Sequence, residues 1–259
     1  MKDFKPNLIP NNGDGIDLLP IIERNGGISE YMVSPKKDGV RLLLKDGKVL
    51  SRALKEPNSV HVLERFTPLA TLCNELGIIM EGEFYAHGMS FNEIFRFYSN
   101  TDCTRPKSIK EGEFPSRSIE WLTTFHDDLK FWWFDGIVID QPDLSYEERL
   151  YEITQLLLPF RSDWKKVMEL PIIIAVHTER ELKLTYEVML DEGYEGLVLT
   201  HRKHLYKFGR NTIKEGTLLK MKDDKDKERK DVTVSVPCIC MQTTTVLEGD
   251  KEEEEIENG

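Results

Sequence analysis

The chain has 259 residues, of which 39% are hydrophobic and 31% are charged, with 35 Lys and Arg against 46 Asp and Glu, a formal charge of −11. This composition is typical of a soluble globular protein with one large or two modest domains, and it excludes a disordered chain. The longest apolar stretches, such as 170–176, are shorter than the about 20 residues that a transmembrane helix needs. The first residues lack the apolar region of a secretory signal, so we expect a cytoplasmic protein with reduced cysteines.

The acidity of the chain is unevenly distributed. Residues 241–259 hold seven acidic side chains and one lysine, whereas residues 201–230 hold eleven basic side chains and five acidic ones. A basic segment followed by an acidic end is a marked asymmetry. The overall charge of −11 therefore does not exclude a nucleic-acid partner, although a solvated surface and a disordered tail would give the same pattern.

In the first half of the chain, residues 1–29 are polar and rich in Asn, Gly and Pro, which predicts a loop with a short helix near 18–24. Asp46-Gly47 predicts the turn of a β-hairpin. The predicted strands are 31–35, 39–44, 49–52 and 78–85. Asn58-Ser59 predicts the start of a helix that runs to about residue 76. Its apolar side is predicted to hold Val60, Leu63, Leu69 and Leu72, and a second helix is predicted at 90–98.

The second half begins with a polar, irregular segment at 100–128 that predicts a surface loop. Aromatic and β-branched residues predict a buried strand at 130–140. Thr178 and Glu181 have the spacing of a capping box at a helix start. The other predicted elements are helices at 146–158 and 179–192 and strands at 170–176, 196–200, 216–221 and 232–240. Because strands and helices do not alternate regularly, we predict an α+β fold with mostly antiparallel sheets.

The segment with the clearest chemical meaning is Ser34-Pro-Lys-Lys-Asp-Gly-Val-Arg41, between two predicted strands. A lysine on a tight turn beside a glycine can approach a phosphate closely, and its amine is a nucleophile when neutral. Burial or a neighbouring cation favours the neutral form, and Lys37 supplies such a cation beside Lys36. Taken alone, Lys-x-Asp-Gly is equally compatible with a hairpin turn that carries surface lysines.

Six more segments follow in order: Leu50-Ser-Arg-Ala-Leu-Lys55, Glu81-Gly-Glu-Phe84, Phe131-Trp-Trp-Phe-Asp-Gly136, Tyr194-Glu-Gly-Leu-Val198, Tyr206-Lys-Phe-Gly-Arg210 and Leu218-Leu-Lys-Met-Lys222. With the Lys36 segment, this ordered set resembles the motifs of the covalent lysyl-nucleotide superfamily, which comprises ATP-dependent DNA ligases, RNA ligases and mRNA capping enzymes. The resemblance spans about residues 30–222 and is strongest to the small ATP-dependent DNA ligases of phages and large DNA viruses. It implies a nucleotidyltransferase (adenylation) domain at 1–222, built of antiparallel sheets flanked by helices.

The resemblance implies roles for individual residues. Lys36 is implied to attack the α-phosphate of ATP and to carry AMP, while Lys220 and Lys222 neutralise that phosphate and favour the neutral amine of Lys36. Glu83 is implied to bind the ribose. Phe134 is implied to stack on adenine, and strand alternation puts it on the same face as Trp132, although an aromatic strand is also typical of a core. The residues implied to bind the nucleotide are Ser34, Arg41, Arg52, Glu83, Phe134 and Glu195.

Metal and nucleic-acid ligands are implied as well. Glu195 and Asp38 are implied to hold Mg²⁺ or Mn²⁺, which need few protein carboxylates because phosphates and water complete the coordination shell. The side chains implied to contact the backbone of nicked duplex DNA are Arg52, Lys55, Arg202, Lys207 and Arg210, with Lys203 and Lys214 beside them.

The family pattern stops at residue 222. Relatives continue into an OB-fold domain that clamps DNA and orients the pyrophosphate, whereas residues 223–259 predict only a truncated start of such a domain and an acidic, disordered tail. Self-adenylation is the step that depends most on the missing motif. We therefore expect a truncated product, an isolated domain or half of a split enzyme, with an OB-like clamp in trans as a candidate partner.

The leading hypothesis is the catalytic domain of an ATP-dependent DNA ligase. As implied by the resemblance, it would be a monomer without membrane association, located in the cytoplasm (of the host, if phage-encoded), and would act in DNA repair, replication or recombination. Two alternatives stay open at this point: an RNA ligase or mRNA cap guanylyltransferase of the same superfamily, and a non-catalytic nucleic-acid-binding remnant.

Overall fold

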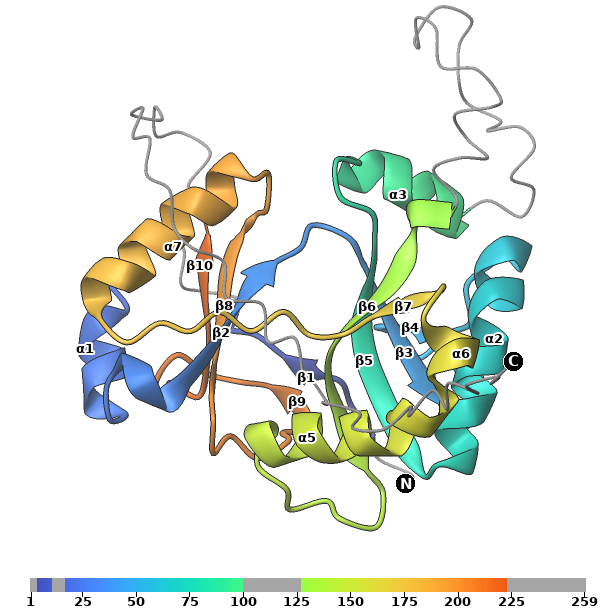
Figure 1. The fold of residues 1–259 in the computed structure, drawn as a ribbon, viewed down its shortest axis with the longest axis horizontal. Coiled ribbons are helices and arrows are strands. Elements are labelled where there is room, and N and C mark those ends of the chain that lie inside the picture. Colours follow the sequence, from blue (N-terminus) through green and yellow to red (C-terminus); the bar gives the residue numbers. More distant parts are fainter. Residues whose placement is uncertain (1–3, 11–16, 100–126, 223–259) are drawn as a thin grey trace, which may run out of the picture.

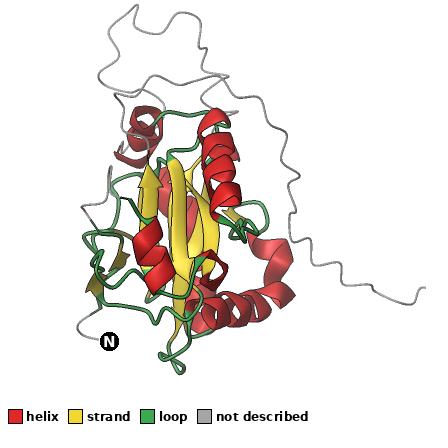
Figure 2. Ribbon diagram, turned by 90° about the vertical axis from the view of Figure 1, so that its left-hand side faces the viewer, coloured by secondary structure: helices red, strands yellow, loops and turns green. Residues whose placement is uncertain are grey.

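A computed structural model describes residues 4–10, 17–99 and 127–222. Two β-sheets lie side by side in it, and helices cover their outer sides (Figures 1 and 2). The predicted strand at 232–240, the acidic tail and most of the predicted loop at 100–128 lie outside the described residues. Among the described helices, none has both the length and the apolar character needed to span a membrane.

The larger sheet has five strands in the order β4-β3-β5-β6-β7. Its neighbouring strands are antiparallel except for β6 and β7, which are parallel. The predicted hairpin is confirmed, because Asp46 and Gly47 take the left-handed φ values of 53° and 72° between β3 and β4. The strands are β3 (Val40–Lys45), β4 (Lys48–Ser51), β5 (Ile78–Tyr85), β6 (Lys130–Val138) and β7 (Met168–Glu169).

The smaller sheet has the order β10-β8-β2, with both neighbours antiparallel. A separate pair of two-residue strands, β1 and β9, is parallel and was not predicted. Segments this short, about 200 residues apart in the sequence, leave no local pattern that could reveal their pairing. The strands are β1 (Asn7–Leu8), β2 (Tyr31–Lys36), β8 (Gly196–His201), β9 (Gly209–Arg210) and β10 (Leu218–Lys222).

Helix starts follow the capping residues of the sequence. The Ser59 side chain accepts a hydrogen bond from the backbone at the start of α2, and Thr178 and Glu181 form the predicted capping box of α7. Ser145 and Glu148 form another capping box at the start of α5. The described helices are α1 (Leu19–Arg24), α2 (Val60–Glu75), α3 (Phe91–Ser99), α5 (Tyr146–Leu157), α6 (Arg161–Trp164) and α7 (Glu179–Asp191), with 3₁₀ turns η1 (Ile28–Glu30) and η2 (Leu158–Phe160).

Helix α2 packs on the larger sheet with the expected apolar side, except at its first residue. Val60 is 48% exposed, so its predicted place on the apolar side is wrong. The fully buried stripe instead follows the helical spacing of Val62, Phe66, Leu69, Ala70 and Cys73. Leu63 and Leu72 of the expected side are half-buried and pack against the same core. Val60 is exposed because it lies two positions before Val62 and so points to nearly the opposite side of the helix.

The predicted strand at 170–176 is also wrong. This segment makes a single isolated bridge, between Ile174 and Val33 of β2, where the Ile174 N–H donates to the Val33 carbonyl at 2.8 Å. Pro171 has no N–H to donate to a ladder. The apolar side chains of 170–176 pack into two different cores. Ile173 packs against the core of the larger sheet, and Val176 is buried in the core of the smaller sheet. The segment is an extended crossing between them.

Apart from these corrections, the strands and helices predicted within the described residues are found within a few residues of their expected positions. The α+β fold with mainly antiparallel sheets flanked by helices is confirmed.

Candidate active site

A cavity of about 630 Å³ lies between the two sheets, and side chains of both line it. This size is typical of small-molecule sites, which have about 300–1,000 Å³. The predicted site residues that line the cavity are Ser34, Lys36, Arg41, Arg52, Glu83, Phe134, Arg210 and Lys220. The predicted site residues that do not line it are Asp38, Lys55, Arg202, Lys207, Glu195 and Lys222. Of these, Glu195 is ion-paired with Lys36, which lines the cavity, and Lys222 is ion-paired with Glu195.

Lys36 is the last residue of β2 and pairs with Gly196 of the neighbouring strand β8. The Glu195 N–H donates to the Lys36 carbonyl at 2.9 Å, and the Lys36 ammonium forms an ion pair with the Glu195 carboxylate. Lys222 of β10 forms a second ion pair with the same carboxylate at 2.5 Å. Although burial raises the pKa of Glu195, its hydrogen bonds with Lys222 and Lys36 outweigh burial and leave that pKa below its ordinary value. Glu195 is therefore a carboxylate shared by two lysines.

Gly196 makes this arrangement possible. Its φ of +142° is one that L side chains rarely adopt, and a β-carbon there would lie 2.1 Å from the Met221 carbonyl oxygen. Because the backbones of β8 and β10 approach so closely here, Lys222 lies opposite Gly196 in the ladder and beside the neighbouring Glu195.

Lys37 contacts aromatic rings. Its ammonium lies 4.7 Å from the centre of the Trp132 ring and 5.9 Å from that of Tyr194, distances at which cation–π attraction acts. Burial lowers the pKa of Lys37 to about 8, while the nearby Glu83 carboxylate opposes that shift. Lys36 and Lys37 are thus adjacent cations in different surroundings, one paired with a carboxylate and the other over aromatic rings.

Glu83 lies on β5 next to the turn that follows Lys36. A β-carbon at Gly39 would lie 2.8 Å from the Glu83 Cγ, so only glycine allows the turn to pass this close. Burial raises the pKa of Glu83 to about 7, against the lowering effect of Arg41 and the two lysines. Near neutral pH this carboxyl group is therefore present in both protonation states, and it can accept or donate a hydrogen bond.

Phe134 is the extra residue of a β-bulge in β6. Glu81 of β5 pairs with Asp135 and Gly82 pairs with Trp133, so Phe134 has no partner across the ladder. The bulge puts Phe134 and Asp135 on the cavity side in succession, and Trp133, which is buried in the core, borders the cavity as well. Phe134 therefore lines the cavity, and its stacking on adenine stays a prediction.

The Phe134 ring is covered on one face by Arg41. The Arg41 guanidinium carbon lies 4.9 Å from the centre of the ring. The same guanidinium is ion-paired with the fully buried Glu81 and donates to the Asn7 carbonyl at 2.7 Å. Its Nε is buried and has no hydrogen-bond partner within the described residues. A bound ligand in the cavity would find an available donor there.

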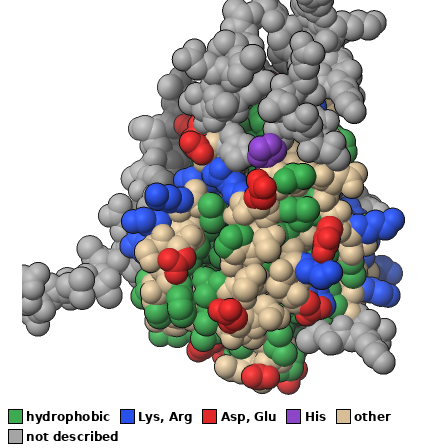
Figure 3. Space-filling view, turned by 90° about the vertical axis from the view of Figure 1, so that its right-hand side faces the viewer, with side chains coloured by type: hydrophobic (Ala, Val, Ile, Leu, Met, Phe, Trp, Pro, Cys, Tyr) green, Lys and Arg blue, Asp and Glu red, His purple; other side chains and the backbone are tan. Residues whose placement is uncertain are grey.

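The basic residues predicted to contact DNA are divided between two environments. Arg202 is ion-paired with Glu147 at 2.5 Å and Lys207 with Glu215 at 2.5 Å, both at the surface. Arg210 lines the cavity and donates to the Ile9 carbonyl at 2.8 Å. Lys55 and Arg52 are exposed, with Arg52 at the edge of the cavity. On the side of the molecule where β4, α2 and α3 lie, basic side chains are interspersed with acidic and hydrophobic ones (Figure 3).

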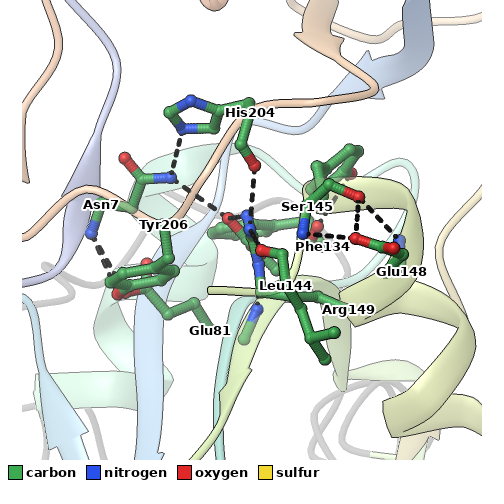
Figure 4. Close-up of polar contacts among 12 residues, drawn as sticks. Asn7, Glu81, Phe134, Leu144, Ser145, Glu148, Arg149, His204 and Tyr206 are labelled. Atoms are coloured by element: carbon green, nitrogen blue, oxygen red, sulfur yellow. Dashed lines mark hydrogen bonds and ion pairs between the residues drawn. The ribbon is translucent and has the colours of Figure 1, made fainter. Parts of the chain in front are cut away.

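A buried polar network that was not predicted surrounds the Phe134 side of the cavity (Figure 4). Arg149 of α5 forms an ion pair with Asp135, with nitrogen–oxygen distances of 3.0 and 3.1 Å. Arg149 also donates to the His204 carbonyl at 2.9 Å. The Tyr206 hydroxyl donates to Glu81. Arg149 did carry a signal, as a charged residue among the apolar positions of a predicted helix, whereas Asp135 was hidden in an aromatic strand.

The described residues include no group of three or more His, Cys, Asp and Glu side chains that could hold a metal ion. Asp38 is exposed and does not line the cavity, whereas Glu195 is ion-paired with Lys36 and Lys222. A cation at Glu195 would therefore need ligands from a bound molecule or from water.

The chain is similar in sequence or fold to known DNA ligases. The family model of the ATP dependent DNA ligase domain matches residues 21–222. Among solved structures, the Chlorella virus DNA ligase-adenylate is 22% identical, with a TM-score of 0.59 over 84% of this chain and 68% of that one. The ATP-dependent DNA ligase of bacteriophage T7, in complex with ATP, is 17% identical, with a TM-score of 0.57 over 85% of this chain and 69% of that one.

A third structure, from a study of Lig E DNA ligases, is 19% identical, with a TM-score of 0.54 over 85% of this chain and 68% of that one. At these identities the structures establish the fold. A search of curated proteins by sequence found no match. The family match favours a DNA ligase over an RNA ligase, a capping enzyme or a non-catalytic remnant. It covers most of the chain and every predicted motif, and the chain therefore belongs to the ATP-dependent DNA ligase domain family, as a DNA ligase nucleotidyltransferase domain.

Proposed function

We propose that this domain seals nicks in duplex DNA through an AMP held covalently on Lys36. The neutral Lys36 amine attacks the α-phosphorus of ATP, a P–N bond forms as the bond to the β-phosphate oxygen breaks, pyrophosphate leaves and the amine proton goes to solvent. The AMP then passes to the 5′-phosphate of the nick, and the 3′-hydroxyl displaces it. The observation that carries this proposal is that Lys36 shares one cavity with Glu83, Phe134 and Lys220.

The cavity suits ATP in shape and chemistry. Phe134 offers a ring face for adenine, and Glu83 offers a carboxyl group for a ribose hydroxyl. Lys36 and Lys220 bring positive charge for the phosphates, and the unpartnered Nε of Arg41 is a further donor. Ser34 and Arg52 line the same cavity, and we assign them to the nucleotide as well.

We assign Glu195 as the protein ligand of a divalent cation, Mg²⁺ or Mn²⁺. Its lowered pKa keeps it ionised, which fits a hard cation, and the nucleotide phosphates would complete the coordination. When bound, the cation would neutralise phosphate charge during transfer. Asp38 is the weaker candidate, because it is exposed and does not line the cavity.

We assign Arg52, Lys55, Arg202, Lys207 and Arg210 to the backbone of nicked DNA. Arg52 and Arg210 are supported best, because both line the cavity from which AMP is transferred. Arg202 and Lys207 would exchange their present carboxylate partners for phosphates, so we expect their contribution to weaken with salt. We further propose that residues 1–222 act as a monomeric catalytic unit in the cytoplasm, with an OB-like module clamping the duplex.

The test is covalent labelling. The wild-type protein mixed with α-³²P-ATP and Mg²⁺ should retain label after denaturation, and Lys36→Ala should retain none. Lys37→Ala is the matched control and should keep substantial labelling, because its ammonium lies over Trp132 and is not paired with Glu195. Equal labelling of wild type and Lys36→Ala would overturn the assignment.

Substrate class is tested separately. Labelling with α-³²P-GTP should be weak, and the labelled protein should seal a nick in duplex DNA. Sealing only with an RNA 3′-hydroxyl, or labelling only by GTP, would contradict the DNA ligase assignment.

A further inference from the structure

Asn7 of β1 uses all of its polar groups in the interior of the protein. It is 3% exposed. Its side-chain NH₂ lies 3.1 Å from Asp135 Oδ2 and 3.1 Å from His204 Nε2, and its side-chain oxygen accepts from Asn211 at 2.6 Å. Because burial lowers the pKa of His204 to about 4, the His204 ring is neutral and can accept this hydrogen bond. The amide of Asn7 is thus fixed in one orientation (Figure 4).

The backbone of Asn7 is bound equally firmly. Its N–H lies 3.1 Å from Glu81 Oε1 and 3.1 Å from the Tyr206 hydroxyl, and its carbonyl accepts from Arg41 at 2.7 Å. Arg41 therefore has two anchors, the Glu81 carboxylate and the Asn7 carbonyl. Those anchors hold the guanidinium over the Phe134 ring at 4.9 Å.

Asn7 is also the first residue of a cavity wall. Residues 7–10 all line the cavity. The wall is fixed from outside by the strand pairing of β1 with β9, by Arg210 donating to the Ile9 carbonyl at 2.8 Å, and by the Asn211 N–H donating to the Leu8 carbonyl at 2.8 Å. Residues 7–10 thus connect β9, which carries Arg210, to the side of the cavity where Phe134 lies.

We propose that Asn7 is a positioning residue for ATP. It holds the 7–10 wall in place and orients Arg41 over Phe134, and it acts on the nucleotide through them. The proposal rests on the proposed function, since it takes the cavity as the ATP site. It predicts an effect on nucleotide affinity that exceeds the effect on the chemical step, because Lys36 and Glu195 lie outside the network of Asn7.

The experiment measures ATP binding apart from catalysis. In the Lys36→Ala background, where no AMP can be transferred to the protein, calorimetry gives the Kd for ATP with and without Asn7→Ala. We expect Asn7→Ala to raise the Kd by about tenfold, the size of effect that loss of a buried hydrogen-bonding group produces. Asn7→Asp should raise it at least as much, because a carboxylate replaces the donor that faces Asp135. Asn25→Ala is the matched control, since its side-chain amide donates to the Ile21 carbonyl of α1 and is not part of the network of Asn7, so the Kd of this variant should stay unchanged.

Labelling kinetics with Lys36 present supply the second readout. Asn7→Ala should raise the KM for ATP by about tenfold, with a maximal labelling rate within about threefold of wild type. If Asn7→Ala proves insoluble, Tyr206→Phe, which removes one oxygen of the same network, should raise the KM by several-fold. An unchanged Kd and KM in these variants would overturn the proposal. A wild type that binds ATP without becoming labelled would instead reject the Lys36 chemistry and leave the Asn7 comparison intact.

Discussion

Lys36 and Glu195 are joined twice, by the backbone hydrogen bond from the Glu195 N–H to the Lys36 carbonyl and by the ion pair between their side chains. The backbone bond fixes the strand ends, and the ion pair fixes the amine. The proposed nucleophile and an anionic side chain, 159 residues apart in the sequence, are thereby kept in one place.

Glu195→Gln tests this relationship. The variant keeps the size of the side chain but removes the charge that Lys36 and Lys222 share. We expect the labelling rate to fall by about a hundredfold, because loss of a charged positioning group in an active site costs on this order. We also expect the Mg²⁺ concentration for half-maximal rate to rise, which a metal titration measures. An unchanged Mg²⁺ dependence would remove Glu195 from the metal site.

Phe134→Leu tests the stacking surface. The substitution keeps an apolar group in the cavity but removes the aromatic face, so the affinity for ATP should fall about tenfold, as expected for loss of one stacking contact. Phe134→Trp should bind ATP nearly as well as wild type. Trp132→Phe on the same strand is the control, and calorimetry in the Lys36→Ala background gives all three Kd values. Equal binding by Phe134→Leu would place adenine elsewhere.

Gly196→Ala tests the close approach of β8 and β10. The new methyl group would meet the Met221 carbonyl, so we expect a loss of about 2–4 kcal/mol in the free energy of unfolding, measured with urea. Gly193→Ala is the matched control. Gly193 also has a positive φ, of +86°, but open space around the position of a β-carbon, so it should lose only about 1 kcal/mol of backbone strain. Similar losses in the two variants would show that the contact with Met221 is unimportant.

His204 gives the protein a pH-dependent stability. Its pKa in the folded state is about 4, because burial disfavours the charged ring, against an ordinary value of 6.5. The unfolded chain therefore binds more protons between these values, and stability should fall as the pH falls from about 6.5 toward 4, by a total of about 2–3 kcal/mol. Urea unfolding at several pH values measures this slope. His204→Gln keeps an acceptor for Asn7 but cannot titrate, and a slope that persists unchanged in it would assign the effect to other groups.

Local sequence patterns predicted the structure correctly where it depends on residues close together in the chain. The hairpin at Asp46-Gly47 and the capping box of Thr178 and Glu181 are set by residues a few positions apart, and both form as predicted. The structure brings Lys36, Glu83, Phe134 and Lys220 of the ordered motifs into one cavity, and each lies on or directly after a strand that the sequence predicts.

The features that the sequence did not predict correctly depend on contacts between segments far apart in the chain. The 170–176 run is apolar because it crosses between two cores, and composition alone cannot distinguish such a crossing from a strand. Asn7 lies in a polar, Pro-rich start that predicts a loop, and its importance comes from partners more than 70 residues away. The sequence also gives no sign of the ion pairs of Arg202 and Lys207, whose carboxylate partners Glu147 and Glu215 lie 55 and 8 residues away, and their contact with DNA stays a prediction.

The one-residue bulge at Phe134 has a consequence for which deletions strand β6 can accept. Between Phe131 and Trp133 the strand alternates regularly, and after the bulge the alternation resumes with Asp135 on the cavity side. Removing Phe134 would close the bulge and leave Asp135 opposite Glu81 and beside Arg149, so the pairing of the strand would survive. Strand β6 should therefore fold without this residue, whereas the cavity would lose the ring over which Arg41 lies.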